Sequence, residues 1–308
     1  MFFLDYKQMF IYNYIRVDNM IDEFIDYLAN IKKYSKYTCI NYRDDLICFK
    51  DYLDMHNKTF KATYQDIRGY IAYLYDLKKS NKTITRNISS LRSFYKYLIR
   101  FNKIDENPMI LISNPKQDKL LPHYLTNEDI EKLLSLTNKD TTYDIRDNLI
   151  IELLYSTGIR VSELVNIKLS DIDLINESIK VLGKGKKVRI VYFGNICRDK
   201  IKRYLNIRNT INPKNIEYLL INKRGDRLSD RSVRKIFESI IKINHLDITF
   251  TPHTLRHTYA THMLNEGSDI RSVQELLGHS SITTTGIYTH VSNEHLRSVY
   301  LKSHPRGK

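Results

Sequence analysis

Apolar residues recur three or four positions apart through the first hundred residues of the chain. This spacing places them on one face of a helix, with polar residues on the opposite face. Four segments share the pattern and are joined by short polar connections: Met20–Ile31, Ser35–Leu53, Thr63–Leu77 and Thr83–Phe101. Four amphipathic helices of this kind predict a compact helical domain over residues 20–110.

Prolines interrupt this pattern at the end of the helical block. Asn107-Pro108 ends the fourth segment, and the stretch from Asn114-Pro115 to Leu121-Pro122 has the composition of an exposed hinge. We therefore predict a linker over residues 111–123, followed by a second domain over residues 124–308. Residues 1–19 precede the first periodic segment and are interpreted as an N-terminal extension.

The second domain is predicted to be mostly helical. Thr126 can cap a helix, and Asp129 stands at the matching capping-box position. The apolar segment from Asp144 to Tyr155 predicts a buried helix that ends at Thr157-Gly158. Further helices are expected over residues 199–209, 229–241, 254–265, 269–277 and 281–291.

Two β-branched runs, Ser178–Leu182 and Val188–Tyr192, depart from the helical pattern. The sequence Gly183-Lys184-Gly185-Lys186 lies between them. This arrangement predicts a β-hairpin with Lys184 in or beside its turn. The expected fold class is therefore mainly α, with a helical N-terminal domain and a mostly helical second domain that contains a small β-sheet.

The charge of the chain favours a polyanionic partner. The 308 residues include 49 Lys and Arg against 35 Asp and Glu, a formal net charge of +14. Nucleic acid is the commonest partner of such a protein. Basic residues gather on the polar face of the fourth predicted helix, where they can contact either DNA or only solvent: Lys82, Arg86, Arg92 and Lys96.

Cysteine content and hydropathy indicate a cytoplasmic protein. The three cysteines, Cys39, Cys48 and Cys197, have no metal-like spacing, and a sparse odd number fits a reducing compartment. No segment reaches the length of a membrane span. The apolar N-terminus is interrupted by Asp5 and Lys7, which argues against a signal peptide.

Two arginines are candidate ligands for a phosphodiester. A planar guanidinium can donate paired hydrogen bonds to phosphate oxygens and stays charged at any working pH. Arg160 follows a glycine turn at a helix start, where backbone donors are also expected to point at an anion. Arg256 lies one helical turn from His253, so both side chains are expected on one face. For either arginine alone, a surface ion pair would be the favoured interpretation, and only the other residues of the set change this.

Tyr288 is the candidate nucleophile for attack on that phosphodiester. A free phenol has a pKa of about 10, so it requires a base or strongly positive surroundings. His253 can take the proton, and His279 can donate a hydrogen bond to the phosphate. Lys184, near two arginines, is a plausible acid for the leaving 5′-hydroxyl. The competing interpretations are a core tyrosine, a helix-end histidine and a flexible basic turn.

Metal-dependent chemistry is a weaker interpretation of the same sequence. Asp171 and Asp173 suggest a two-metal nuclease, but no further carboxylates occur in matching context. His253 and His257 have metal-ligand spacing without the adjacent glutamate of a zinc protease. Glu163, one turn after Arg160, is interpreted as a partner that orients an arginine. We expect no metal and no other cofactor.

Together these motifs resemble those of the tyrosine recombinases, also called the phage integrase family, and within them the Xer recombinases. The resemblance runs from about Met20 to Lys308. It is carried by five motifs: Ser156–Leu164, Gly183-Lys184-Gly185, Thr251–His257, Leu276–Ser280 and Ile287–Val291.

The resemblance implies a SAM-like core-binding domain and a catalytic domain that clamp duplex DNA. It implies Tyr288 as the nucleophile that forms a 3′-phosphotyrosyl bond, without cofactors. Its implied catalytic partners are Arg160, Lys184, His253, Arg256 and His279. It further implies tetramers of the protein with itself or a paralogue, strand exchange through a Holliday junction, and a C-terminal segment, His295–His304, that docks on a neighbour.

The expected role is resolution of chromosome and plasmid dimers at cell division, and the resemblance implies a septal DNA translocase as a regulator. Three rivals stay open at this point: the integrase of a mobile element, a type IB topoisomerase, and a DNA-binding protein without catalysis. The first two share the chemistry proposed for Tyr288. The third would need neither Tyr288 nor Lys184.

Overall fold

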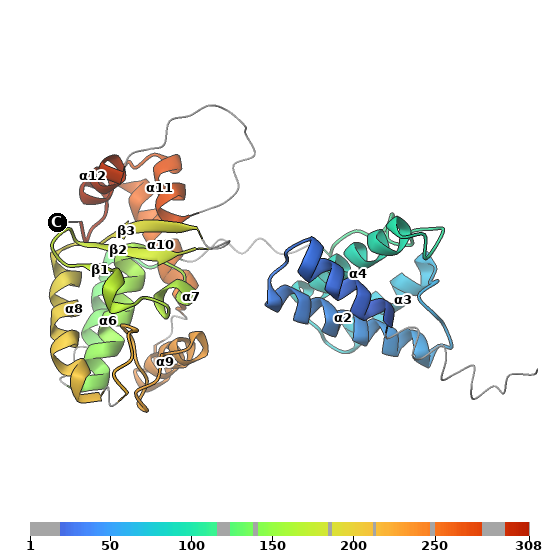
Figure 1. The fold of residues 1–308 in the computed structure, drawn as a ribbon, viewed down its shortest axis with the longest axis horizontal. Helices are drawn as coiled ribbons and strands as arrows, with labels where there is room; N and C mark the ends of the chain where they lie inside the picture. The colour runs from blue at the N-terminus through green and yellow to red at the C-terminus, as the bar shows by residue number, and fades with distance from the viewer. Residues whose placement is uncertain are drawn as a thin grey trace, which may run out of the picture. The chain divides into compact units, whose positions relative to one another are not determined.

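The computed structural model describes residues 19–115, 124–137, 141–183, 187–211, 214–246, 250–278 and 293–307 (Figure 1). The chain divides into two compact units, Met1–Leu120 and Leu121–Lys308. Most of the predicted linker, residues 116–123, lies outside the described residues. The mainly helical fold class predicted from the sequence is confirmed.

The described residues of unit 1 form four helical segments, as the periodicity predicts. Residues 19–26 are helical and continue into a π-helix, η1 (Tyr27–Ile31). They are followed by α2 (Lys36–Met55), α3 (Tyr64–Asp76) and α4 (Asn81–Arg100). Each of these three begins where a hydroxyl side chain caps it, at Ser35, Thr63 and Ser80.

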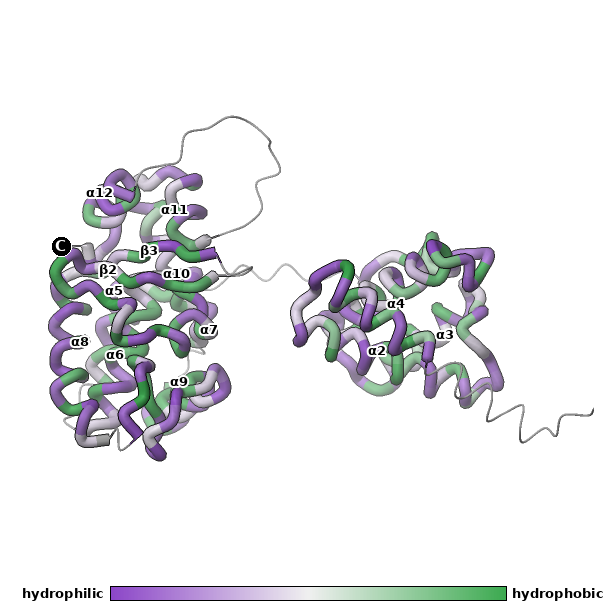
Figure 2. The backbone as a smooth tube through the Cα atoms, in the orientation of Figure 1, coloured by the Kyte–Doolittle hydropathy of each residue, from purple (hydrophilic) through white to green (hydrophobic). Residues whose placement is uncertain are grey.

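Aromatic side chains fill the core of unit 1. Phe49 of α2 stacks on Phe60 and meets Tyr70 of α3 edge-on, with ring centroids 4.9 Å apart in the second pair. Phe24 meets Phe94 of α4 edge-on at 5.3 Å. Such rings remove large apolar areas from water, and their edge-to-face geometry adds to the gain. Figure 2 shows the apolar and polar positions alternating along these helices.

Unit 2 is built around α6, which is buried along most of its length. Helix α6 (Thr142–Thr157) packs against α8 (Asn195–Arg208) and α10 (Pro252–Asn265). Helix α5 (Asn127–Leu136) begins at Thr126 with the predicted capping box to Asp129. Besides the strands, the other described elements of unit 2 are, in chain order, α7 (Val161–Leu164), η2 (Leu169–Asp171), η4 (Asn209–Ile211), α9 (Asp230–Ile243), α11 (Ile270–Leu277) and α12 (Asn293–Ser303).

The small sheet of unit 2 is antiparallel, in the order β1-β2-β3. Strands β2 (Ser178–Leu182) and β3 (Val188–Tyr192) form the predicted hairpin, with Leu182 opposite Val188. Strand β1 (Ile172–Asp173) pairs with β2 and was missed, because two residues give no alternating pattern. Lys184 lies outside the described residues.

Local structure accounts for the remaining differences from the predicted elements. Helix α10 begins at Pro252, because proline fits the first helical position and Thr251 caps it. Helix α8 begins four residues earlier than predicted, after Gly194. The predicted helix over residues 281–291 lies outside the described residues. Asp173 accepts hydrogen bonds from the backbone of Ile175 and Asn176, which is a turn-forming role.

The C-terminal helix α12 packs within unit 2. Leu296 and Tyr300 are buried in a cluster with Tyr259 and Leu276. The imidazole of His304 is stacked against the ring of Tyr300, and burial lowers its pKa to about 3. These apolar residues of the segment His295–His304 are therefore covered by their own unit in this structure. Docking of this segment on a neighbour stays a prediction.

A buried carboxyl in unit 1 makes its stability depend on pH. The Asp45 side chain is 3% exposed and pairs with Arg86 at 2.6 Å between Oδ2 and Nη1. Burial raises the pKa of Asp45 to about 6, although Arg86 opposes this. The folded state thus holds the proton more tightly than the unfolded state, so this contribution is present below about pH 4 and lost as pH rises through about 6.

We predict that Asp45→Asn becomes progressively more stable than the wild type between pH 4 and pH 7. Between these pH values, the free energy of unfolding of the variant should rise relative to that of the wild type by up to about 3 kcal/mol, the equivalent of two pKa units. Hydrogen exchange of α2 and α4 peptides, compared between the two proteins at each pH, measures it within the full chain. Asp44→Asn, at the adjacent exposed position, is the control. A difference that is flat across this range contradicts the prediction.

Candidate active site

The chain turns sharply at Gly158, where α6 ends. Gly158 has φ 61° and caps α6 in the left-handed conformation that glycine adopts without strain. A Cβ at this position would stand 2.7 Å from Tyr259 Cδ1 and 2.9 Å from Leu277 Cδ2. The backbone of this turn therefore lies directly against α10 and α11. Arg160 follows two residues later, so the turn determines where its side chain begins.

Arg160 is held in place by Glu163. The backbone N–H of Arg160 donates to Glu163 Oε2 at 2.8 Å, and its Nη1 donates to Oε1 at 2.9 Å. The expectation that backbone donors here point at an anionic ligand is not met at Arg160. Its N–H is already bonded to the side chain of Glu163, and α7 has only four residues. The Arg160 side chain remains one-third exposed. Glu163 thus has the arginine-orienting role predicted for it.

A third arginine, Arg189 of β3, completes the ion-pair network. Its Nη1 and Nη2 donate to the two oxygens of Glu163 at 2.9 and 2.8 Å. Burial raises the pKa of Glu163, but hydrogen bonds from Arg189 and from the Arg160 backbone outweigh it, and the pKa is lowered. Glu163 is therefore a carboxylate at neutral pH, held between two guanidinium groups.

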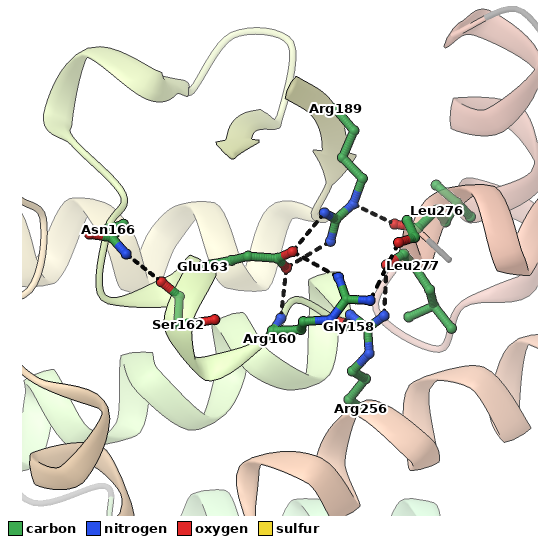
Figure 3. A network of polar contacts seen from close by, with 10 residues as sticks. Gly158, Arg160, Ser162, Glu163, Asn166, Arg189, Arg256, Leu276 and Leu277 are labelled. Carbon is green, nitrogen blue, oxygen red and sulfur yellow. Dashed lines mark hydrogen bonds and ion pairs between the residues drawn. The ribbon is translucent and has the colours of Figure 1, made fainter. Parts of the chain in front are cut away.

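The three arginines also donate hydrogen bonds to the carbonyls at the end of α11. Arg189 Nε donates to Leu276 O at 3.0 Å, Arg256 Nη2 to Leu277 O at 2.6 Å, and Arg160 Nη2 to Gly278 O at 3.3 Å. Figure 3 shows this convergence on consecutive carbonyls. The last carbonyls of a helix have no partner within the helix and carry partial negative charge. The end of α11 is thus fixed by three side chains from three different elements.

Arg256 is buried and is held by carbonyl oxygens. Its Nη1 donates to Gly158 O at 2.5 Å, in addition to the bond with Leu277 O. Burial and the nearby charge of Arg160 lower the pKa of Arg256 to about 10, so it is still protonated at neutral pH. The network contains three guanidinium groups and one carboxylate (Figure 3), which leaves excess positive charge for an anionic ligand.

His253 lies in the first turn of α10, one turn before Arg256. The two residues differ in burial: His253 is exposed, whereas Arg256 is buried, with 6% of its surface exposed. The other predicted site residues, Lys184, His279 and Tyr288, lie outside the described residues. The structure therefore brings together Arg160 and Arg256 of the predicted set, with His253 on the same helix as Arg256.

The neighbouring histidines have structural roles or remain at the surface. His262 is buried and its Nδ1 lies 2.9 Å from the Tyr155 hydroxyl, which is a structural role. Among the described residues, no group of three His, Cys, Asp or Glu side chains is placed to hold a metal ion.

Arg189 was missed by sequence reasoning, although a signal for it exists. In the hairpin, Arg189 stands opposite Val181, and Val191 stands opposite Ile179. Ile179, Val181 and Val191 are all buried, so Arg189 occupies an inward-facing position of a β-branched strand. A charged residue at such a position requires a partner. The partner itself, Glu163, could not be identified from sequence spacing.

Two family models match the chain. The phage integrase family model matches residues 123–295, and the model of the phage integrase N-terminal SAM-like domain matches residues 21–102. The chain belongs to the phage integrase family, the tyrosine recombinases, and the resemblance seen in its motifs is confirmed.

Curated relatives match over nearly their whole length. Tyrosine recombinase XerC of Staphylococcus carnosus (strain TM300) is 44% identical over 292 residues, which are 94% of this chain and 99% of the relative. Tyrosine recombinase XerC of Staphylococcus epidermidis (strain ATCC 12228 / FDA PCI 1200) is 43% identical over 295 residues, 95% and 99% of the two chains. From the sequence, the C-terminal residues from Ser298 to Lys308 are expected to resemble XerC more than XerD, and these matches are to relatives named XerC.

Solved structures of DNA complexes share the fold. The XerH site-specific recombinase bound to its difH substrate in a pre-cleavage complex has a TM-score of 0.65 and 28% identity, covering 84% of this chain and 77% of that one. The Tn1549 transposon integrase with circular intermediate DNA has a TM-score of 0.74 and 21% identity, covering 91% and 97%, which is a likeness of fold. None of the described helices has the length and apolar composition needed to cross a bilayer.

We predict that Gly158→Ala destabilises unit 2 more than Gly267→Ala does. Both glycines have positive φ, which costs alanine about 1 kcal/mol. A Cβ at Gly267 meets nothing within 4 Å, whereas one at Gly158 meets Tyr259 and Leu277. The clash should add roughly 1–3 kcal/mol. Thermal unfolding of the two variants measures the difference, and equal destabilisation would show that the turn at Gly158 relaxes freely.

Proposed function

We propose that the chain is a site-specific recombinase that cuts and rejoins duplex DNA. The hydroxyl of Tyr288 attacks a backbone phosphorus, forms a 3′-phosphotyrosyl bond and displaces the 5′-hydroxyl of the next nucleotide. The reverse attack by a 5′-hydroxyl of the partner strand releases Tyr288 and rejoins the DNA. The observation that supports this most is the arginine cluster at the end of α11, whose excess positive charge suits a phosphodiester.

In this proposal each member of the site has one role. Arg160 and Arg256 bind the non-bridging oxygens and stabilise the extra negative charge of the pentavalent transition state. His253 accepts the proton of Tyr288, and His279 donates a hydrogen bond to the phosphate. Lys184 protonates the leaving 5′-oxygen. The chemistry conserves the number of phosphodiester-type bonds, so it requires no nucleotide as an energy source. The guanidinium groups supply the charge stabilisation that a metal ion would otherwise provide, so no metal is expected.

Unit 1 is proposed to contact the DNA backbone as the core-binding domain, over residues 20–110. A groove of about 440 Å³ on this unit is lined by basic and tyrosine side chains: Tyr27, Lys32, Tyr34, Tyr42, Arg92, Lys96, Tyr97 and Arg100. Lysine and arginine in such a groove can pair with phosphates. Of the predicted basic cluster, Arg92 and Lys96 line this groove, whereas Arg86 is paired with Asp45.

The biological role we propose is resolution of chromosome and plasmid dimers in the cytoplasm. The chain spans almost the full length of relatives named XerC, which supports this over the integrase of a mobile element. Four protomers, of this chain alone or of this chain and a paralogue, would join two DNA sites and exchange strands through a Holliday junction. A septal DNA translocase is a candidate regulator of the reaction.

We predict that a nicked DNA substrate carrying the host's resolution site traps a covalent complex with the wild-type protein. The nick lets the fragment with the 5′-hydroxyl diffuse away, so religation is prevented. The complex should form in the presence of EDTA and be absent with Tyr288→Phe, which lacks the attacking oxygen. A denaturing gel reads out the complex. Tyr218→Phe, in the same unit and outside the proposed set, should behave as the wild type.

The outcomes separate the rival functions. Complex formation with Tyr288→Phe would exclude Tyr288 as the nucleophile, and loss of the complex in EDTA would exclude a metal-independent reaction. Tight binding without cleavage, also in the presence of the paralogue, would identify a DNA-binding protein without catalysis. Relaxation of DNA that contains no resolution site would identify a topoisomerase.

A further inference from the structure

We propose that Arg189 is a positioning residue for the strand-cleavage step. It holds Arg160 through Glu163 and fixes the backbone immediately before Lys184 and His279, without contacting the DNA itself. The inference rests on the function proposed above. Arg189 links the hairpin, the start of α7 and the end of α11 through a single guanidinium group. Figure 3 shows it between Glu163 and the carbonyl of Leu276.

The first of these links acts on Arg160. Arg189 donates to both oxygens of Glu163, which fixes the plane and position of the carboxylate. The same two oxygens hold the backbone N–H and the Nη1 of Arg160. Because a bidentate pair has little orientational freedom, the direction of the Arg160 guanidinium depends on Arg189.

The second link acts on the end of α11. Arg189 Nε donates to Leu276 O, and the Arg189 side chain packs closely against Gly278. A Cβ at Gly278 would stand 3.0 Å from Arg189 Nη1 and 3.1 Å from its Cδ and Cζ. The close approach of arginine and backbone therefore fixes where the chain leaves α11. The next residue in the sequence is His279.

The third link acts on the hairpin from which Arg189 itself projects. A Cβ at Gly183 would stand 3.3 Å from Arg189 Nη1 and 3.7 Å from Glu163 Oε1. The backbone N–H of Gly183 donates to Lys187 O at 2.8 Å, which closes the described part of the hairpin end. The next residue is Lys184. Arg189 thus lies against the residues that immediately precede two of the proposed catalytic groups, and against the carboxylate that holds a third.

The hydrogen bonds of Arg189 separate it from the phosphate-binding arginines. Its Nε, Nη1 and Nη2 each donate to a protein oxygen, two of them to a carboxylate. The Arg189 side chain is 15% exposed, against 34% for Arg160. Arg189 is therefore a support for the site, and its loss should affect the rate of cleavage more than the affinity for DNA.

Arg189→Lys tests this role. Lysine keeps the charge but cannot reproduce the hydrogen bonds that Nε, Nη1 and Nη2 donate in different directions. We expect DNA affinity within about twofold of the wild type and a single-turnover cleavage rate constant reduced about 100-fold, in the range seen for lost supporting contacts. Affinity is measured with an intact resolution site, and cleavage with the nicked substrate in the full-length protein.

Arg208→Lys is the matched control for a purely structural effect. Arg208 is 2% exposed, lies in the same unit, and donates to the backbone carbonyls of Leu219, Ile216 and Tyr218. The Arg208→Lys substitution should lower the melting temperature at least as much as Arg189→Lys does. It should leave the cleavage rate of the DNA-bound protein unchanged. If the cleavage rates of the two variants fall in proportion to the decreases in their melting temperatures, the role of Arg189 is structural and the proposal is wrong.

Coupling to Glu163 gives a second readout. If Arg189 acts on Arg160 through Glu163, the double variant Arg189→Lys with Glu163→Gln should lose little more cleavage rate than the slower single variant. Independent, multiplying losses would contradict the relay. Should Arg189→Lys fail to fold, Gly183→Ala serves instead, because it leaves the ion pair in place and pushes the hairpin end against Arg189. Its cleavage rate should fall about tenfold at an unchanged melting temperature.

The failure of this inference is distinguishable from failure of the proposed function. A wild-type protein that forms no Tyr288-dependent complex refutes the recombinase chemistry itself. A wild type that cleaves, together with an Arg189→Lys protein that cleaves at the same rate, refutes only the positioning role.

Discussion

The arrangement of the site depends on one buried carboxylate, that of Glu163. Without it, three guanidinium groups would lie close together with no opposite charge among them, and their repulsion would drive them apart. Glu163 holds Arg160 by both backbone and side chain and accepts both terminal nitrogens of Arg189. It thereby ties a one-turn helix to a strand. Its side chain is 3% exposed, so water screens these contacts little.

Backbone carbonyls hold the cations where carboxylates would neutralise them. The end of α11 offers three consecutive oxygens, and each accepts from a different arginine. A carbonyl satisfies a donor while contributing only a partial charge. Arg256 is accordingly fixed by the oxygens of Gly158 and Leu277 and keeps its full positive charge. The helix end provides order, and the charge remains available for a phosphate.

Local sequence patterns predicted the elements that depend on local physics. The capping box of Thr126, the break at Gly158 and both strands of the hairpin follow from residues a few positions apart. The network around Arg189 joins residues 26 and 87 positions apart, which no periodicity encodes. Arg160 and Arg256 were identified through motifs and lie together. The roles of Lys184, His279 and Tyr288 stay predictions, since these residues lie outside the described part of the chain.

The excess charge of the cluster links folding of unit 2 to its ionic surroundings. The folded unit concentrates Arg160, Arg189 and Arg256 around one carboxylate, whereas the unfolded chain separates them (Figure 3). Any small anion that enters the cluster therefore binds the folded form preferentially and stabilises it by mass action. Phosphate or sulfate in a buffer would then stabilise the folded unit. Stabilities measured in different buffers would report anion occupancy as well as the fold.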